Sequence, residues 1–155
     1  MLNTAAWYDY TMREDVYEKA IKLLSIRLHT TGELRRKLQM KGYTPADILE
    51  VLRKLEELKF LDDRRFAEMF VDNLKRYKYF GYFGIKAKLA ARQVPGDVAA
   101  AVLAEFFSAE DEQAVAERLL KKLKRAGKNT YEKQARAFAS RGFRSDVIHS
   151  VLVKE

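Results

Sequence analysis

The chain has 155 residues, with 30 Lys and Arg against 22 Asp and Glu, so its formal net charge is +8. It contains no Cys, which excludes disulfides, thiolate metal sites and cysteine nucleophiles, and we expect a cytoplasmic protein. With 48% hydrophobic and 34% charged residues, the chain can bury a core, which argues against global disorder. We expect neither a secretion signal nor a membrane span, since no segment approaches roughly 18 uninterrupted apolar residues.

Apolar residues recur at intervals of three and four along the whole chain, and no segment alternates with a period of two. This pattern predicts an all-α fold. Gly and Pro fall between the periodic segments, where helices end and turns begin. In chain order, we expect helices over residues 16–28, 30–42, 44–58, 62–74, 85–89, 95–106, 108–123, 129–138 and 144–152.

Several helix starts show a capping pair, in which Ser, Thr or Asn precedes Glu or Asp by three positions. The pairs are Thr30 with Glu33, Ser108 with Asp111, and Asn129 with Glu132. Asp62 and Asp63 are adjacent, so on a helix their carboxylates point about 100° apart, and we expect capping rather than metal or acid/base chemistry. His29 and His149 lack ligand spacing or a triad. We therefore predict no catalytic residue, no metal and no cofactor.

The helix lengths repeat three times as a long helix, a short helix, a turn and a third helix. The turns at Gly42, Gln93 and Gly142 lie 51 and then 49 residues apart, and a Val-Leu pair follows nine residues after each. We divide the chain into an N-terminal arm (1–14) and three-helix repeats over 15–60, 61–107 and 108–155. Such repeats are expected to stack into an elongated, curved body. Trp7 and the Tyr8–Tyr10 segment form either a tail or an interaction arm.

Basic residues gather near the junction of the first and second helices of each repeat, and two of these runs, from 75 to 93 and from 118 to 128, hold no acidic residue. Aromatic residues interleave with the first run, which suits nucleic acid, although a solvated helix face is the simpler reading for any single lysine. The candidate contact residues for a filament or nucleic acid are Arg35, Arg36, Lys37, Lys41, Lys75, Arg76, Lys78, Lys86, Lys88, Arg92, Lys121, Lys122, Lys124 and Arg125. The candidate stacking residues are Tyr77, Tyr79 and Tyr82, whereas Phe80 and Phe83 are expected to pack between repeats.

Three stretches of the chain resemble the RecX family of bacterial recombination regulators. They are Glu33-Leu34-Arg35-Arg36-Lys37-Leu38 leading to Lys41-Gly42-Tyr43 and on to Ile48 and Val51-Leu52 with Leu55, Leu61-Asp62-Asp63-Arg64-Arg65-Phe66-Ala67, and Gly84-Ile85 with Leu89. The resemblance is strongest from Ala20 to Leu89. The chain departs from the family pattern where Lys59-Phe60 precedes Leu61 and where Gln93 replaces a turn glycine, and Gln134 stands in the third repeat where Leu34 stands in the first.

The resemblance implies tandem three-helix repeats and a non-enzymatic regulator, and we expect a monomer. Such a protein binds the RecA recombinase and its nucleoprotein filament, contacts single- or double-stranded DNA without strong sequence preference, and inhibits recombination and ATP hydrolysis during DNA repair and the SOS response. Two alternatives stay open. One is a sequence-specific helix-turn-helix protein, although the third helices begin with Pro45-Ala46-Asp47 and Pro95-Gly96-Asp97, whose acidic first turn would repel phosphate. The other is a helical-repeat scaffold for a different acidic partner.

Overall fold

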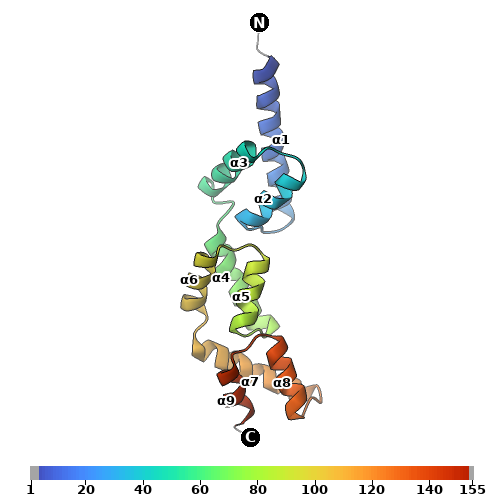
Figure 1. Ribbon diagram of the computed structural model, residues 1–155, viewed down its shortest axis with the longest axis vertical. Coiled ribbons are helices and arrows are strands. Elements are labelled where there is room, and N and C mark those ends of the chain that lie inside the picture. Colours follow the sequence, from blue (N-terminus) through green and yellow to red (C-terminus); the bar gives the residue numbers. More distant parts are fainter. Residues whose placement is uncertain (1–3, 154–155) are drawn as a thin grey trace. The chain divides into compact units, whose positions relative to one another are not determined.

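The computed structural model describes the backbone of residues 4–153 and the side chains of residues 13–153. Within that range the chain forms helices and no strand, which confirms the all-α prediction (Figure 1). No helix in the described part has the length and apolar character needed to cross a membrane. The elements are α1 (Thr4–Ile26), α2 (Thr31–Met40), α3 (Pro45–Glu57), α4 (Asp63–Asn73), the π-helix η1 (Leu74–Lys78), α5 (Tyr82–Ala91), α6 (Gly96–Phe106), α7 (Ala109–Arg125), α8 (Tyr131–Ser140) and α9 (Ser145–Leu152).

Helix α1 begins well before the periodic segment that predicted it. Apolar periodicity reports the buried face of a helix rather than its full length, and the buried residues of α1 start at Val16 and Ala20, both fully buried. The residues of the predicted arm from Thr4 onward are part of this helix. The side chains of Trp7 and the Tyr8–Tyr10 segment lie outside the described residues.

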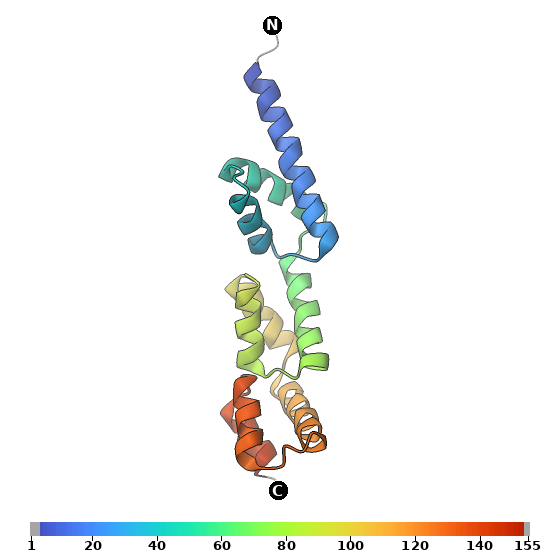
Figure 2. The same cartoon turned by 90° about the vertical axis from the view of Figure 1, so that its right-hand side faces the viewer.

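The chain divides into two compact units. Unit 1 comprises the residues up to Phe66 together with Arg92–Val94, and unit 2 comprises Ala67–Ala91 and the residues from Pro95 onward. In unit 1, helices α1, α2 and α3 pack around one another, as the view in Figure 2 also shows. Their core consists of Val16, Ala20, Leu34, Leu38, Ile48, Val51, Leu52, Leu55 and Leu61. The three-and-four spacing predicts most of these positions, but its prediction is wrong for Leu28 and Leu58, which it also places on buried faces and which are 55% and 50% exposed.

Unit 2 contains the second and third helix triplets. Its most buried apolar residues include Ile85, Leu89, Val102, Leu103, Val115, Leu119 and Phe138. Most of them lie where the three-and-four spacing predicts, whereas Phe106, which the spacing also places on a buried face, is 38% exposed. The Phe138 ring packs edge-on against Phe143, with the ring centroids 5.1 Å apart. Gln134 replaces an apolar residue in this core, and its amide Nε2 donates to the carbonyl oxygen of Lys128 at 3.0 Å. The polar side chain is therefore satisfied although it is buried.

The predicted caps are confirmed at two helices and wrong at a third. Thr30 with Glu33 and Ser108 with Asp111 form complete capping boxes at α2 and α7. At α8 the capping position is Thr130, and its side chain makes no capping hydrogen bond, so the expected Asn129 box is not formed. The pattern alone could not fix this start, because Asn129 and Thr130 are both favourable capping residues.

The adjacent carboxylates at the start of α4 act as caps, as predicted. Asp62 Oδ1 accepts a hydrogen bond from the Arg65 amide at 3.0 Å, within its own helix. Asp63 Oδ1 instead accepts from the Thr31 amide, at the first position of α2, at 2.8 Å. Each carboxylate thus satisfies an amide that a helix start leaves without a partner.

Candidate nucleic-acid interface

The C-terminal end of α4 carries a feature that the sequence pattern did not predict. The helix continues as the π-helix η1 and stops at Tyr79, which adopts a left-handed backbone with φ +55°. Left-handed backbone at a non-glycine residue costs free energy, and π-helical turns occur frequently at functional sites. In this chain, η1 places basic residues from the first acid-free run at the end of a helix, next to α7.

Helix α7 brings the second acid-free run to the same place. Arg118 Nη2 donates to the carbonyl oxygen of Lys75 at 2.9 Å, and Nη1 donates to that of Arg76 at 3.5 Å. A cation at a helix C-terminus satisfies exposed carbonyl groups and interacts favourably with the helix dipole. Arg118 therefore joins the two basic runs, which are separate in the sequence.

Tyr79 lies at the centre of this junction. The Arg118 guanidinium carbon is 5.6 Å from the centre of the Tyr79 ring, and the Lys122 ammonium nitrogen is 4.8 Å from it. These distances are those of cation–π interactions. Lys121 follows Arg118 by three positions on α7 and so shares its side of the helix. We call the residues gathered here the Tyr79 surface, which consists of Arg76, Lys78, Tyr79, Arg118, Lys121 and Lys122.

Nearby carboxylates are already paired with two of the candidate cations. Lys75 Nζ lies 2.6 Å from Asp111 Oδ1, and Arg76 Nε lies 2.7 Å from Asp72 Oδ1. Burial opposes ionisation of Asp111, but hydrogen bonds from Lys75 and Ser108 outweigh it and lower the pKa of the carboxyl group.

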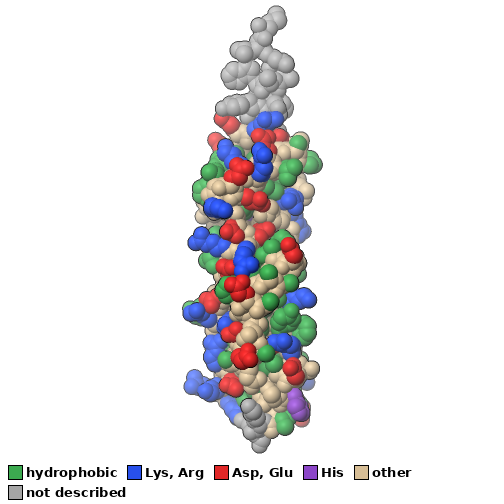
Figure 3. All heavy atoms as spheres, turned by 90° about the vertical axis from the view of Figure 1, so that its left-hand side faces the viewer, with side chains coloured by type: hydrophobic (Ala, Val, Ile, Leu, Met, Phe, Trp, Pro, Cys, Tyr) green, Lys and Arg blue, Asp and Glu red, His purple; other side chains and the backbone are tan. Residues whose placement is uncertain are grey.

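The remaining lysines of the Tyr79 surface have no carboxylate partner in the described part of the chain. They are exposed, and they are Lys78, Lys121 and Lys122. The Tyr79 surface thus keeps an excess of positive charge. By contrast, the face drawn in Figure 3, over α3 and over α6, carries acidic and basic side chains together.

The other candidates in unit 2 lie apart from these contacts. Lys88 on α5 places its ammonium 4.5 Å from the centre of the Phe80 ring, while Lys86 is exposed. Lys124 and Arg125 are exposed in the last turn of α7, where cations are favourable.

The three candidate tyrosines differ in environment. Tyr77 is 66% exposed. The Tyr79 ring contacts the Arg118 and Lys122 cations of α7. The Tyr82 ring lies edge-on to Phe83 and under Arg144. The expectation that Phe83 is packed is wrong, since 55% of it is exposed. Tyr77 is therefore the candidate that presents most of its ring for stacking.

In unit 1, the candidate Arg92 is held by a carboxylate. Its Nε lies 2.6 Å from Glu33 Oε1, and Arg27 Nη1 lies 3.1 Å from Glu33 Oε2. Burial opposes ionisation of Glu33, but hydrogen bonds from Arg92, Arg27 and the Thr30 amide outweigh it and lower its pKa. Arg92 therefore contributes to the packing of unit 1 and is less available to phosphate than its sequence context indicated.

His29 and Lys37 form a second polar contact at the start of α2. Lys37 Nζ lies 2.9 Å from His29 Nε2, and His29 Nδ1 lies 2.9 Å from the carbonyl oxygen of Arg27. Burial is the main cause of the lowered pKa of His29, so the neutral imidazole that accepts from Lys37 is favoured. The remaining candidates of unit 1 are exposed, and they are Arg35, Arg36 and Lys41.

Sequence reasoning missed the residues whose roles depend on distant partners. From the sequence, Arg118 is only one member of a basic run, and nothing there indicates its contact with η1. Glu112 lies in the first turn of α7 beside two other acidic residues, yet it is completely buried and accepts from the amides of Tyr82 and Arg144 and from the Arg144 side chain. No local pattern distinguishes such a carboxylate from a solvated one.

Comparisons with protein families match the described helices closely. The models described as the first, second and third three-helix domains of RecX match residues 17–55, 62–103 and 110–152. These ranges confirm the three sequential triplets and their order. They cover most of the chain.

Individual relatives and solved structures agree with this result. The chain is 33% identical over 134 residues to the regulatory protein RecX of Prosthecochloris aestuarii, which covers 86% of this chain and 89% of the relative. It is 36% identical over 139 residues to that of Vibrio parahaemolyticus, with 87% and 88% covered. The crystal structure of RecX from Lactobacillus salivarius superposes with a TM-score of 0.82 at 21% identity and covers 94% of this chain and 97% of that one. A further crystal structure of a regulatory protein RecX gives a TM-score of 0.85 at 21% identity, with 100% and 81% covered.

Proposed function

Because the chain belongs to the RecX family of regulatory proteins, we propose that it binds the RecA recombinase and its nucleoprotein filament and inhibits strand exchange and ATP hydrolysis. It would thereby act in DNA repair and in control of the SOS response. The effect would come from binding alone, by a monomer, with no chemical step of its own.

The observation that carries this proposal is the Tyr79 surface. Two basic runs from separate helices meet there, and the nearby carboxylates Asp72 and Asp111 are already occupied by Arg76 and Lys75. Cations without carboxylate partners attract phosphate with little sequence preference, because the phosphate backbone is the same in every sequence. Tyr77, whose ring is exposed, would add stacking on an unpaired base.

The proposal has a measurable electrostatic consequence. If about four phosphates of single-stranded DNA are neutralised, the logarithm of the binding constant should fall with the logarithm of salt concentration at a slope of about −3. Binding that is indifferent to salt would contradict a phosphate contact at the Tyr79 surface.

The decisive experiment is titration of the purified protein into a RecA ATPase reaction that depends on single-stranded DNA. We expect the wild-type chain to lower the ATPase rate. The triple variant Lys78→Gln, Lys121→Gln and Lys122→Gln should require about tenfold more protein for the same inhibition, since each exposed charge pair contributes modestly.

A matched control removes the same positive charge elsewhere on the molecule. Lys22→Gln, Lys133→Gln and Arg136→Gln change exposed residues outside the Tyr79 surface, so inhibition should stay near the wild-type level. Equal weakening by both triple variants would show that only net charge matters. An unchanged ATPase rate with the wild-type chain would contradict the proposed function itself.

A further inference from the structure

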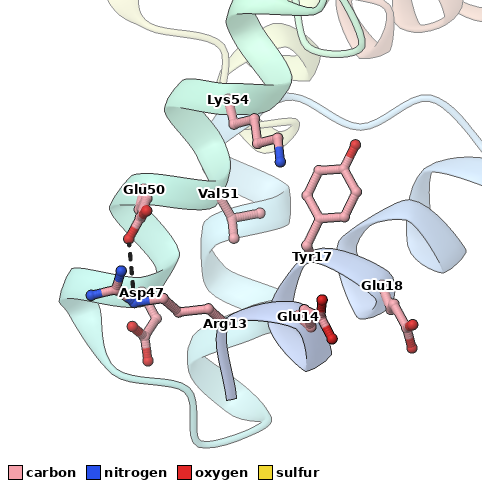
Figure 4. Close-up of a pocket in the computed structure, with 8 residues that line it drawn as sticks. All are labelled: Arg13, Glu14, Tyr17, Glu18, Asp47, Glu50, Val51 and Lys54. Carbon is pink, nitrogen blue, oxygen red and sulfur yellow. Dashed lines mark ion pairs between the residues drawn. The ribbon is translucent and has the colours of Figure 1, made fainter. Parts of the chain in front are cut away.

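Unit 1 contains a groove whose chemistry is opposite to that of the Tyr79 surface. It lies between α1 and α3, has a volume of about 580 Å³, and is lined from both helices (Figure 4). Helix α1 supplies Arg13, Glu14, Tyr17 and Glu18, and helix α3 supplies Asp47, Glu50, Val51 and Lys54. In a chain of net charge +8, this lining holds four carboxylates and two cations.

Most of these carboxylates have no partner among the side chains that the structure describes. Arg13 Nε lies 3.7 Å from Glu50 Oε2, a long ion pair between two side chains that are about half exposed. In the described part of the chain, no hydrogen bond or ion pair involves the carboxylates of Glu14, Glu18 and Asp47. A solvent-exposed ion pair of this kind contributes little stability. With four carboxylates against two cations, the lining keeps a net negative charge.

The accessible floor of the groove is aromatic, since Val51 is only 6% exposed, and the Tyr17 ring already contacts a cation. Val51 and Tyr17 lie between the acidic side chains in Figure 4. The Lys54 ammonium is 4.6 Å from the centre of the Tyr17 ring, at cation–π distance. The Lys54 contact is therefore an internal example of the cation–π interaction that a cation of a partner would make with the Tyr17 ring.

The spacing of the carboxylates in the groove determines whether a metal ion or the cationic side chains of a peptide could bind there. In the described residues, no group of three acidic or histidine side chains is close enough to hold a metal ion. Separated carboxylates instead suit several separate ammonium or guanidinium groups along one segment. DNA is excluded by like charge.

We propose that this groove binds a basic peptide segment of a protein partner, with Lys or Arg side chains paired to Glu14, Glu18 and Asp47 and one of these cations in contact with the Tyr17 ring. The site would give the molecule a protein contact that does not compete with phosphate for the Tyr79 surface. The inference does not depend on the proposed function, because its test contains neither RecA nor DNA.

The experiment measures fluorescence anisotropy of a short labelled peptide that alternates Arg with Leu, titrated with the full chain. The groove variant is Glu14→Gln, Glu18→Gln and Asp47→Asn. Its control, Asp97→Asn, Glu110→Gln and Glu132→Gln, changes net charge equally but alters exposed carboxylates of unit 2. We expect about tenfold weaker binding for the groove variant and wild-type affinity for the control.

A second variant tests the floor of the groove. Tyr17→Leu keeps an apolar side chain but removes the aromatic face, so we expect about threefold weaker binding of the same peptide. Circular dichroism should show unchanged helicity in every variant, since the altered carboxylates make no structural contact.

Several results would overturn the inference. These are no peptide binding by the wild-type chain at low salt, or equal loss in the groove and control variants. Saturable Mg²⁺ binding abolished by the groove variant would point to a metal instead. A concentration-dependent dimer in analytical ultracentrifugation, abolished by the groove variant, would identify a second copy of the chain as the occupant.

Discussion

Two equivalent contacts between successive helix triplets, which we call the first and second junctions, are held together by different kinds of interaction. In each, the turn before a third helix docks on the start of an earlier short helix. The first junction lies in unit 1, where the turn at Arg92–Val94 meets the start of α2. The second lies in unit 2, where the turn at Arg141–Phe143 meets the start of α5.

The first junction depends on side chains. Glu33 forms ion pairs with Arg92 and Arg27, and Thr30 Oγ1 donates to the carbonyl oxygen of Arg92 at 2.7 Å. Gln93 occupies the turn with a left-handed backbone, φ +58°, against Gly32.

The second junction depends on the backbone. The amides of Gly81 and Phe83 donate to the carbonyl oxygens of Arg141 and Gly142 at 3.0 and 2.9 Å. The two backbone segments approach so closely that a Cβ on Gly84 would collide with the Arg141 carbonyl oxygen, so this position inside α5 requires glycine. The same three-helix repeat thus has a charged side-chain contact at the first junction and requires glycine at the second.

The largest expected effect comes from making the second junction resemble the first. Gly142→Gln introduces a side chain at φ +69°, where the new Cβ would collide with the Gly84 backbone. Because backbone on both sides cannot yield, we expect a loss of about 4 kcal/mol in the free energy of unfolding. Urea denaturation, with hydrogen exchange of α5 to localise the loss, measures this change.

The control for this substitution is Gly96→Ala, since nothing lies within 4 Å of a Cβ there and the residue starts α6. We expect stability equal to or slightly above that of the wild type. Similar losses at Gly96 and Gly142 would show that close backbone approach is not what the second junction requires.

The next effect concerns the buried carboxylate beside the second junction. Glu112→Ala leaves the amides of Tyr82 and Arg144 without an acceptor and the Arg144 guanidinium without its partner. We expect a loss of about 3 kcal/mol in urea denaturation, moderated because Arg144 is about one-third exposed. Glu110→Ala, in the same turn but exposed, should change stability by less than about 0.5 kcal/mol.

A smaller effect is expected at the first junction, because its carboxylate can be replaced by an amide of the same shape. Glu33→Gln keeps an acceptor for the Thr30 amide but removes the charge that holds Arg92 and Arg27, and we expect a loss of about 1.5 kcal/mol at neutral pH. Urea denaturation at low and high salt measures it.

This junction also predicts the direction of a pH effect. The pKa of Glu33 is lowered in the folded chain, so its stabilisation is present above the unfolded value near 4.5 and is lost as pH falls through the folded pKa. The wild type should therefore lose more stability on acidification than Glu33→Gln does. Parallel pH profiles of the two proteins would contradict the pairing.

The sequence predicted the parts of this architecture that local patterns encode. Apolar spacing located the seams, as the burial of Leu38 and Val51 shows, and capping pairs located the starts of α2 and α7. The repeat turns were found from Gly42 and its equivalents. The seams and caps depend on residues within about one helical turn of each other, and the repeat is a recurrence of the same local pattern.

The remaining features depend on residues that are distant in the chain. The role of Arg118 requires the end of η1, more than forty positions earlier, and the burial of Glu112 requires both α5 and the turn before α9. The π-helix η1 is likewise not predicted by an apolar period of 3.6. For the same reason, the basic runs indicated an anionic partner but did not separate Arg92, which is paired, from Lys121, which has no carboxylate partner in the described residues.

The smallest effect is the reverse exchange, which makes the first junction resemble the second. Gln93→Gly relieves a left-handed non-glycine residue but makes the unfolded chain more flexible, and we expect a net gain of about 0.5 kcal/mol in urea denaturation. Lys59→Gly is the matched control, since Lys59 has φ +62° at an exposed position outside both junctions. If Lys59→Gly stabilises the chain and Gln93→Gly destabilises it, the Gln93 side chain contributes packing against Gly32 that outweighs the backbone strain. The first junction would then depend on side-chain contact even at its turn.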